Sequence, residues 1–358
     1  MRFAEPMRIA IDATPLKLTT GGLSRYTASL SSALAENYPE DAFALLSGQP
    51  FPMPESHYPN LVSGALPRNA LEGRWWTWGV QHEMNRLDCA LFHGTNFEVP
   101  YVPLRPSVLT VHDLSPWMNP DWHHAADRVR RRGPLIVGLR IATMIITDSE
   151  AVRSQVIERF RVAPSRVVAV PLGAAETFRP VHAGDRPPYF LYAGTLEPRK
   201  NLDQLIEAWR AVRRAQLVDL VLAGRERADF VRPIPEPGLH LLGEVSDADL
   251  AQLYSGAVAV VYPSHYEGFG LPVLEAMQCG ACVFISQDPA LRELGGDAAL
   301  ALDGTRAWVE AMCAATACPQ WLQERREASR IRAREFSWTR TAGLTHEVYE
   351  DAVRRFAF

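Results

Sequence analysis

The chain has 358 residues, which is enough for two domains of ordinary size. It is 47% hydrophobic and 22% charged, as is typical of globular proteins in water. The formal net charge of −4 gives no electrostatic reason to expect a nucleic-acid partner.

The termini and the cysteines favour a cytoplasmic protein. Arg2, Glu5 and Arg8 near the start do not fit a secretory signal. The longest apolar run, residues 134–147, is interrupted by Arg140 and is too short to span a membrane. The five cysteines are sparse and odd in number, so we expect no disulfide framework.

In the first half of the chain, short apolar runs alternate with amphipathic segments. This pattern predicts parallel strands that are each followed by a helix. The expected strands are residues 8–12, 42–46, 89–92, 107–111, 144–147 and 167–170. The expected helices include residues 23–36, 71–86 and 150–160.

The periodicity stops over residues 178–188, a segment with three prolines and a glycine, and then restarts. Strands are expected at residues 189–193, 218–222, 257–262 and 282–285, with a helix at 202–214. We therefore predict domains of residues 1–180 and 181–339. A last amphipathic helix begins at residue 338, and its part from about 340 to 358 is expected to pack back on the first domain.

This alternation predicts an α/β protein of two doubly wound, Rossmann-like domains. Ligands of such folds bind outside the carboxyl ends of the strands, so the two domains are expected to face a central cleft. The loops that follow predicted strands are therefore the first places to search for a site.

The segment YEGFGLPVLEAM, residues 266–277, carries two carboxylates seven positions apart. Glu267 lies in a glycine-containing loop, and Glu275 lies in the helix that begins near Pro272. The free N–H groups of a helix start bind anions. An anion site flanked by two carboxylates suits a ligand with both phosphates and hydroxyls.

Arg199 and Lys200 stand at the start of another predicted helix, where positive charge is unfavourable. A bound diphosphate would relieve this conflict, because Arg binds oxygens in a fork and Lys supplies a point charge. A solvated basic turn is the structural alternative.

Several strings together resemble glycosyltransferase family 4, and the resemblance covers nearly the whole chain. In the second half they are YAGTLEPRKNL (192–202), LLGEVSD (241–247) and PSHYEGFGLPVLEAM (263–277). In the first half they are IAIDATP (9–15), TVHDL (110–114), IITDSE (145–150) and VPLG (170–173). The string FSWTRTA (336–342) near the end also matches.

The resemblance implies the GT-B architecture and a retaining transfer of a hexose from a nucleotide-sugar to a glycan or lipid-linked saccharide. The first half looks closest to bacterial mannosyltransferases of surface polysaccharide assembly, so we expect GDP-mannose as the donor. Beyond this donor substrate no cofactor is expected. The resemblance says nothing about the oligomeric state.

Carried over by position, the resemblance assigns Arg199 and Lys200 to the diphosphate and Glu275 to the ribose hydroxyls. Glu267 would contact the donor sugar near its reacting carbon, and His112 would face that sugar from the first domain. The sugar and phosphate are assigned to the backbone N–H groups of Gly268, Phe269, Gly270 and Leu271, and the base is assigned to Gly224, Arg225 and Val245. The loop of Gly21 and Gly22 would approach the phosphates or the acceptor, and Asp113 is counted among the substrate-binding residues.

The route to retention stays open. Glu267 could be a covalent nucleophile. The resemblance favours attack on the front face of the sugar, with the donor phosphate accepting the acceptor's proton. No metal is expected: Asp247 and Asp249 imitate an Asp-x-Asp metal motif, but Ser246 and Asp249 fit a capping box.

Each assignment has a structural alternative. His112 could be a hydrogen-bonded core residue, and Asp113 could orient it or cap the next turn. The tryptophans at 75, 76 and 78 favour core packing over a sugar platform. The basic run of residues 128–132 is either a solvated face or a contact with the inner membrane surface.

Two other functions fit the same architecture. A non-catalytic nucleotide-sugar-binding protein would not need the intact set of charged residues. A sugar phosphorylase dependent on pyridoxal would need a Schiff-base lysine, and the chain offers only Lys17 and Lys200.

Overall fold

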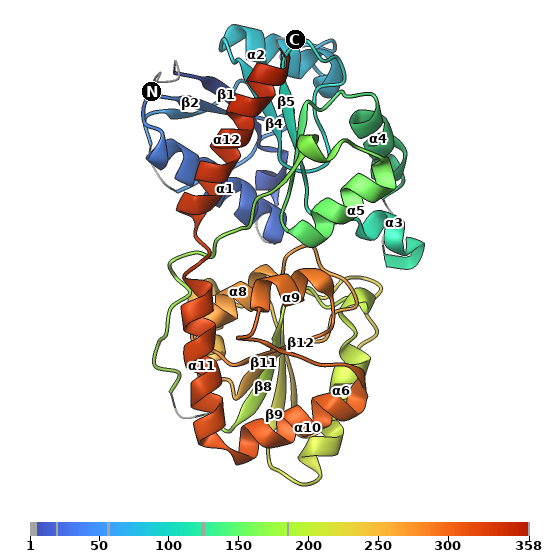
Figure 1. The fold of residues 1–358 in the computed structure, drawn as a ribbon, viewed down its shortest axis with the longest axis vertical. Helices are drawn as coiled ribbons and strands as arrows, with labels where there is room; N and C mark the ends of the chain where they lie inside the picture. Colours follow the sequence, from blue (N-terminus) through green and yellow to red (C-terminus); the bar gives the residue numbers. More distant parts are fainter. Residues whose placement is uncertain (1–5, 19–20, 56–57, 123–125, 185, 357–358) are drawn as a thin grey trace. The chain divides into compact units, whose positions relative to one another are not determined.

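The computed structural model describes residues 6–18, 21–55, 58–122, 126–184 and 186–356. The chain forms two compact units, each an α/β sandwich (Figure 1). Unit 1 comprises Met1–Gly173 together with Trp338–Phe358, and unit 2 comprises Ala174–Ser337.

Within the described residues, the sheet of unit 1 has seven parallel strands in the order β3-β2-β1-β4-β5-β6-β7. Its strands are short and largely buried, as expected of a parallel sheet with helices on both faces. They are β1 (Arg8–Asp12), β2 (Ala42–Leu46), β3 (Leu61–Ser63), β4 (Leu91–Gly94), β5 (Ser107–Val111), β6 (Met144–Thr147) and β7 (Val167–Ala169).

The helices of unit 1 connect these strands and cover them. They are α1 (Gly22–Asn37), α2 (Val80–Arg86), α3 (Ser115–Met118), α4 (Asp127–Gly138), α5 (Glu150–Phe160) and α12 (Trp338–Phe356). Short segments of other helix types are η1 (Thr14–Lys17), η2 (Trp75–Gly79), η3 (Pro120–Trp122) and η4 (Pro164–Arg166).

In the described part of unit 2, the sheet has six parallel strands in the order β10-β9-β8-β11-β12-β13. The strands are β8 (Tyr189–Ala193), β9 (Asp219–Ala223), β10 (Leu239–Gly243), β11 (Ala259–Tyr262), β12 (Val283–Ile285) and β13 (Leu300–Ala301). The helices are η5 (Pro198–Lys200), α6 (Leu202–Arg213), α7 (Asp247–Gly256), α8 (Leu271–Gln278), α9 (Pro289–Gly295), α10 (Gly304–Ala317) and α11 (Pro319–Ala333).

The strand order of unit 2 reverses between β8 and β11. The chain moves outward from β8 to β10 on one side, and then from β11 to β13 on the other. Loops after the two central strands therefore diverge from one point, which is where doubly wound sheets bind ligands. These are the loops that carry Arg199, Lys200 and Glu267.

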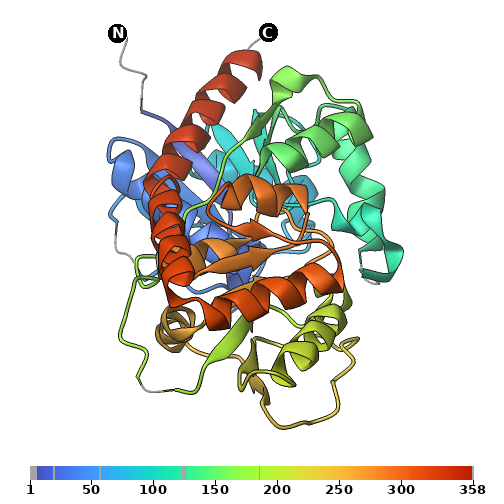
Figure 2. The ribbon, with the colours of Figure 1, turned by 60° about the horizontal axis from the view of Figure 1, so that its bottom comes forward.

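Helix α12 returns the end of the chain to unit 1, as the amphipathic pattern predicts. Figures 1 and 2 show it, in red, running along α1. Its Tyr349 hydroxyl lies 2.6 Å from Nδ1 of His93 in β4, and its His346 donates to Asp41 at 2.7 Å. The buried contacts explain why this helix belongs to unit 1 although it follows unit 2 in sequence.

The boundary between the units falls earlier than the expected residue 180. Phe178 is completely buried and packs on Tyr254 of α7, with ring centroids 6.0 Å apart. The backbone oxygen of Ala175 accepts a hydrogen bond from Gln278 at 3.0 Å. The proline-rich stretch is therefore preceded by residues already packed on unit 2.

Most predicted strands match within two residues, but the predicted helix 71–86 is wrong in part. The segment begins with turns, passes through the single π-helical turn η2, and becomes α-helical only at Val80. Short strands β3, β10 and β13 were not predicted from the sequence, because each is brief or lacks a clear apolar run.

Candidate active site

The loops after β8 and β11 are joined directly by backbone and side-chain contacts. The N–H of His265 donates to the backbone oxygen of Arg199 at 2.9 Å. Nδ2 of Asn201 donates to the backbone oxygen of Pro263 at 3.3 Å. The topological switch point of unit 2 is thus one fixed surface rather than two separate loops.

Three predicted site residues meet on this surface. Nζ of Lys200 lies 2.5 Å from Oε1 of Glu267, and Nη1 of Arg199 lies 3.3 Å from Oε2 of the same carboxylate. Arg199, Lys200 and Glu267 are only 9%, 5% and 7% exposed. The alternative of a solvated basic turn at Arg199 and Lys200 is therefore wrong.

Glu197 is a fourth member of the cluster. Its Oε1 accepts from Nε of Arg199 at 3.1 Å and from Nη2 at 2.7 Å, and its Oε2 accepts from Arg227 at 2.5 Å. Asp229 holds the other side of the Arg227 guanidinium in a fork, with both contacts at 2.6 Å. Glu197 and Arg227 were not among the residues predicted from the sequence, although Glu197 lies within the YAGTLEPRKNL string.

The charges of the cluster stabilise one another. Burial raises the pKa of Glu267, but Lys200 and Arg199 outweigh burial and hold this pKa below its usual value. Burial and the neighbouring Arg199 lower the pKa of Lys200. The hydroxyl of Tyr262, 3.2 Å from Nζ of Lys200, adds a neutral polar partner.

Helix α8 begins beside the cluster, as predicted. Its N-cap residue is Gly270 with φ +104°, and an added Cβ there would meet Leu291 at 2.6 Å, so only glycine fits. Gly268 and Leu271 flank it in the same loop and first turn. Phe269 is buried and packs edge-on against Phe336, so its ring has a packing role.

Glu275 lies inside α8 and is only 1% exposed. Its carboxylate lies 3.4 Å from the hydroxyl of Tyr254 in α7. The residue is thus buried between helices α7 and α8, and it is not an ordinary surface helix residue. Its assignment to a ribose stays a prediction.

The three residues predicted near the base lie on neighbouring loops of unit 2. Gly224 has φ +137°, and an added Cβ would meet the backbone oxygen of Gly194 at 2.0 Å, so packing alone demands glycine there. The side chain of Arg225 is exposed, and Val245 is half-buried. Packing against Gly194 is therefore sufficient to explain why residue 224 is a glycine.

His112 follows β5 in unit 1, and both of its ring nitrogens are engaged. Nδ1 lies 2.7 Å from Asp148, and Nε2 lies 2.8 Å from the backbone oxygen of Thr95. The backbone oxygen of Thr95 only accepts, so Nε2 carries a proton, and when Asp148 is ionised it accepts from Nδ1–H, which makes the ring an imidazolium. Burial raises the pKa of Asp148, and the neighbouring His112 opposes that rise. Burial lowers the pKa of His112, but Asp148 outweighs it and the pKa is raised.

This geometry changes the roles expected around His112. The imidazolium has no lone pair to accept a proton, so it can stabilise negative charge but cannot act as a base. The group that orients it is Asp148 and not Asp113. Oδ1 of Asp113 accepts from the N–H and the hydroxyl of Ser115, at 2.8 and 2.5 Å, and thereby caps the start of α3.

Gly21 and Gly22 lie at the start of α1 and are exposed. Gly21 is the N-cap residue with φ +112°, a conformation that favours glycine. An added Cβ at either position would meet no atom within 4 Å. The open space around them is compatible with the predicted approach of a ligand.

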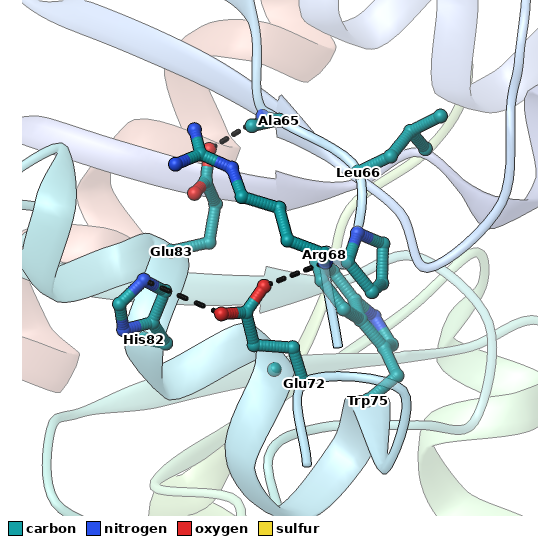
Figure 3. A pocket seen from close by; sticks show the side chains of 9 residues that line it. Ala65, Leu66, Arg68, Glu72, Trp75, His82 and Glu83 are labelled. Carbon is teal, nitrogen blue, oxygen red and sulfur yellow. Dashed lines mark hydrogen bonds and ion pairs between the residues drawn. The ribbon is translucent and has the colours of Figure 1, made fainter. Parts of the chain in front are cut away.

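The tryptophans of η2 pack as predicted, with one exception. Trp75 is buried, and Trp76 packs edge-on against Phe92 of β4. Trp78 is 48% exposed and lies outside the core. Trp75 also lines the pocket of Figure 3, where Glu83 accepts from the N–H of Ala65 at 2.5 Å. None of the predicted site residues lines this pocket.

The alternative sites suggested by sequence have structural explanations. Oγ of Ser246 accepts from the N–H of Asp249 at 3.1 Å, so the Asp-x-Asp pair belongs to the N-terminal cap of α7. Among the described residues, no group of three or more histidines, cysteines or acids is arranged to bind a metal ion. Cys279 and Cys282 are buried free thiols whose pKa burial raises to about 12.

Within the part of the chain that the structure describes, no helix combines the length and the apolar character needed to cross a bilayer.

Comparison with known proteins covers both units. The family described as "Glycosyltransferase Family 4" matches residues 20–178, and "Glycosyl transferases group 1" matches residues 174–333. The chain is 30% identical to the O-antigen chain mannosyltransferase B of Escherichia coli, over 96% of this chain and all of that protein. It is 28% identical to the O-antigen chain mannosyltransferase RfbU of Salmonella typhimurium, over 71% of this chain and 74% of that one.

Among solved structures, a sucrose-phosphate synthase from Thermosynechococcus elongatus superposes with a TM-score of 0.72. The match covers 96% of this chain and 98% of that chain at 20% identity, a level that speaks for the fold alone. The predicted fold class, two Rossmann-like units in the GT-B architecture, is confirmed.

Proposed function

The chain belongs to glycosyltransferase family 4, and from that premise we propose that it moves a hexose from a nucleotide-sugar to a glycan or lipid-linked saccharide with retention at the anomeric carbon. One observation carries the proposal. Arg199, Lys200 and Glu267 are buried together at the switch point of unit 2, beside the start of α8. Cations and a helix start suit a diphosphate, and a carboxylate suits sugar hydroxyls.

The transfer requires a sugar to leave a phosphate. Negative charge grows on the diphosphate, and positive character grows at the anomeric carbon. Donors fixed in advance around the diphosphate stabilise that change without a metal ion. In this proposal Lys200, Arg199 and the α8 start supply these donors.

Retention leaves two roles for Glu267. In the route we prefer, the acceptor attacks the same face from which the diphosphate leaves, and a phosphate oxygen takes its proton. Glu267 then positions the sugar and stabilises positive character at its reacting carbon. A covalent role would require a carboxylate available for attack, whereas the two cations beside Glu267 reduce its nucleophilicity.

Mannose from GDP-mannose is the donor that we propose. The support is the naming of two relatives as O-antigen chain mannosyltransferases, one of them aligned over its whole length. The same names support a glycan as the acceptor, and we propose a glycan or lipid-linked saccharide in that role. Nothing in the described geometry of Gly224, Arg225 or Val245 selects guanine over uracil.

A thermal-shift panel tests the donor. GDP-mannose, GDP, UDP-glucose and UDP would each be added at the same concentration, so that the tightest ligand stabilises most; one present at about 100 times its dissociation constant contributes about 2.7 kcal/mol. We expect GDP-mannose to raise the melting temperature most. A larger shift with UDP-glucose would refute the donor assignment while leaving the class of enzyme intact.

Transfer and hydrolysis assays separate the catalyst from its rivals. A protein that is stabilised by a nucleotide-sugar but never turns it over would be a binding protein. A pyridoxal-dependent phosphorylase would absorb in the near ultraviolet through its Schiff base. Neither lysine suits a Schiff base. Lys17 lies on the surface beside Gln49, and Lys200 is ion-paired with Glu267.

We also propose a peripheral contact with the cytoplasmic membrane surface through α4. Leu135 and Leu139, at and just after its end, are 55% and 69% exposed and would accompany the basic run. The attraction of the basic run to anionic lipids is reduced, because Arg128 already pairs with Glu98 at 3.0 Å. Sedimentation with anionic and with neutral vesicles tests the contact, and equal binding to both would exclude a role for the arginines.

A further inference from the structure

We propose that Glu267 is an internal counter-anion that a nucleoside diphosphate displaces from Lys200. The inference rests on the proposed function and adds an order of events to it. Lys200 first exchanges the carboxylate of Glu267 for a phosphate oxygen, and the released carboxylate then becomes available to the hydroxyls of the donor sugar. The carboxylate of Glu267 therefore changes its partner when the diphosphate binds.

The charge balance of the cluster requires such an exchange. Two cations, Arg199 and Lys200, face two carboxylates, Glu197 and Glu267, so the inner cluster is neutral. A diphosphate would add at least two negative charges to it. Removing charges from water costs free energy unless each gains a partner, so an unchanged cluster would oppose the ligand. Releasing Glu267 leaves a cation for the incoming phosphate.

Lys200 is the cation that can change partners. Nζ of Lys200 contacts only Glu267 and the Tyr262 hydroxyl among the described residues. Arg199 is held more firmly, because it makes two bonds to Glu197 and donates to the backbone oxygen of Tyr266 at 2.5 Å. Arg199 thus anchors the loop, and the flexible ammonium of Lys200 makes the exchange.

The exchange needs only side-chain rotation. The backbone N–H of Glu267 donates to Oδ2 of Asp288 at 3.2 Å, and Oδ1 of Asp288 caps α9 through the N–H of Leu291 at 3.0 Å. The contact between His265 and Arg199 fixes the loop on its other side. Both backbone ties are independent of the Lys200–Glu267 bond, so neither has to break when that bond is lost.

The inference predicts an effect opposite in sign to that of an ordinary binding residue. In Glu267→Gln the anion that competes for Lys200 is gone, so GDP should bind about 10-fold more tightly than to the wild type, on the scale of one charge-assisted hydrogen bond. GDP lacks the hexose of the donor, so the loss of the contact between residue 267 and that hexose does not mask the gain. Transfer from the nucleotide-sugar should fall in the same variant.

The experiment is calorimetric titration of GDP and, in parallel, UDP into full-length wild type, Glu267→Gln and the control Glu236→Gln. Glu236 pairs with Arg210 at 2.6 Å on the surface of the same unit, so its variant removes one negative charge away from the cluster. The control should bind as the wild type does. Tighter binding by Glu267→Gln alone supports the exchange.

Equal or weaker binding by Glu267→Gln would overturn the inference and leave the proposed function standing. If neither nucleotide bound the wild type or any variant, the nucleotide site itself would be refuted, and the inference with it. Glu267→Asp covers the case in which Glu267→Gln does not fold. The shorter side chain of Asp weakens the bond to Lys200 but keeps the negative charge. This variant should therefore bind GDP more tightly than the wild type, but less tightly than a protein with no anion on Lys200. Weaker binding than that of the wild type would again overturn the exchange.

Discussion

Asp148→Asn is the substitution that most directly tests the buried imidazolium of His112. Asp148 is 3% exposed, and its Oδ2 accepts from Nδ1 of His112 at 2.7 Å. An asparagine of nearly the same shape presents either a neutral oxygen or an N–H to that nitrogen. With the N–H, it bonds a neutral ring whose Nε2–H still reaches the backbone oxygen of Thr95. The variant therefore favours a neutral His112.

The size of the effect depends on pH in a defined direction. Asp148 outweighs burial and raises the pKa of His112, so the contribution of the histidine to stability is complete below its unfolded-state pKa of about 6.5 and is lost as pH rises through the folded-state pKa. Burial raises the pKa of Asp148, so the pair is also lost at low pH, where this carboxylate is protonated. A hydrogen bond between charged groups contributes about 1.5–3 kcal/mol. We expect Asp148→Asn to cost about 2 kcal/mol at pH 6 and clearly less at pH 9.

Nuclear magnetic resonance of the His112 ring, followed over pH in the full-length protein, measures the pKa directly. Chemical denaturation of the full-length protein at pH 6 and pH 9 gives the change in the free energy of unfolding. Asp127→Asn is the control, since Asp127 forms an exposed pair with Arg130 and its loss should leave His112 unchanged. An unchanged pKa of His112 in Asp148→Asn would refute the assignment of a charged ring.

Three further outcomes are expected. Lys200→Ala should weaken the binding of GDP about 10- to 100-fold but the binding of guanosine only slightly, because it removes a charged contact with the phosphates. Equal losses of affinity for the two ligands in calorimetry would contradict the assignment. Glu275→Ala should lose its preference for ribo- over deoxyribonucleotides in competition binding, and an unchanged preference would count against a ribose contact. Transfer activity should survive EDTA; its abolition and rescue by a divalent ion would return Asp247 and Asp249 to consideration as metal ligands.

Local patterns in the sequence were reliable guides to local structure. The strand at residues 8–12, the helix at 150–160 and the Ser246 cap all follow from residues close together in the chain. Apolar period, capping oxygens and helix-breaking glycines act over a few residues, so they can be read without the fold. The π-helical turn η2 is the counter-example, because periodicity does not distinguish it from an α-helix.

The sequence by itself therefore determined the doubly wound plan, the family resemblance and the positions at which charged residues follow strands. The tertiary structure decided what those residues do to one another. Glu267 pairs with Lys200 across 67 positions, and Asp148 pairs with His112 across 36. Such pairs form because strand order brings distant loops to one edge of a sheet, and burial then makes each charge depend on its partner. No local pattern specifies that neighbour.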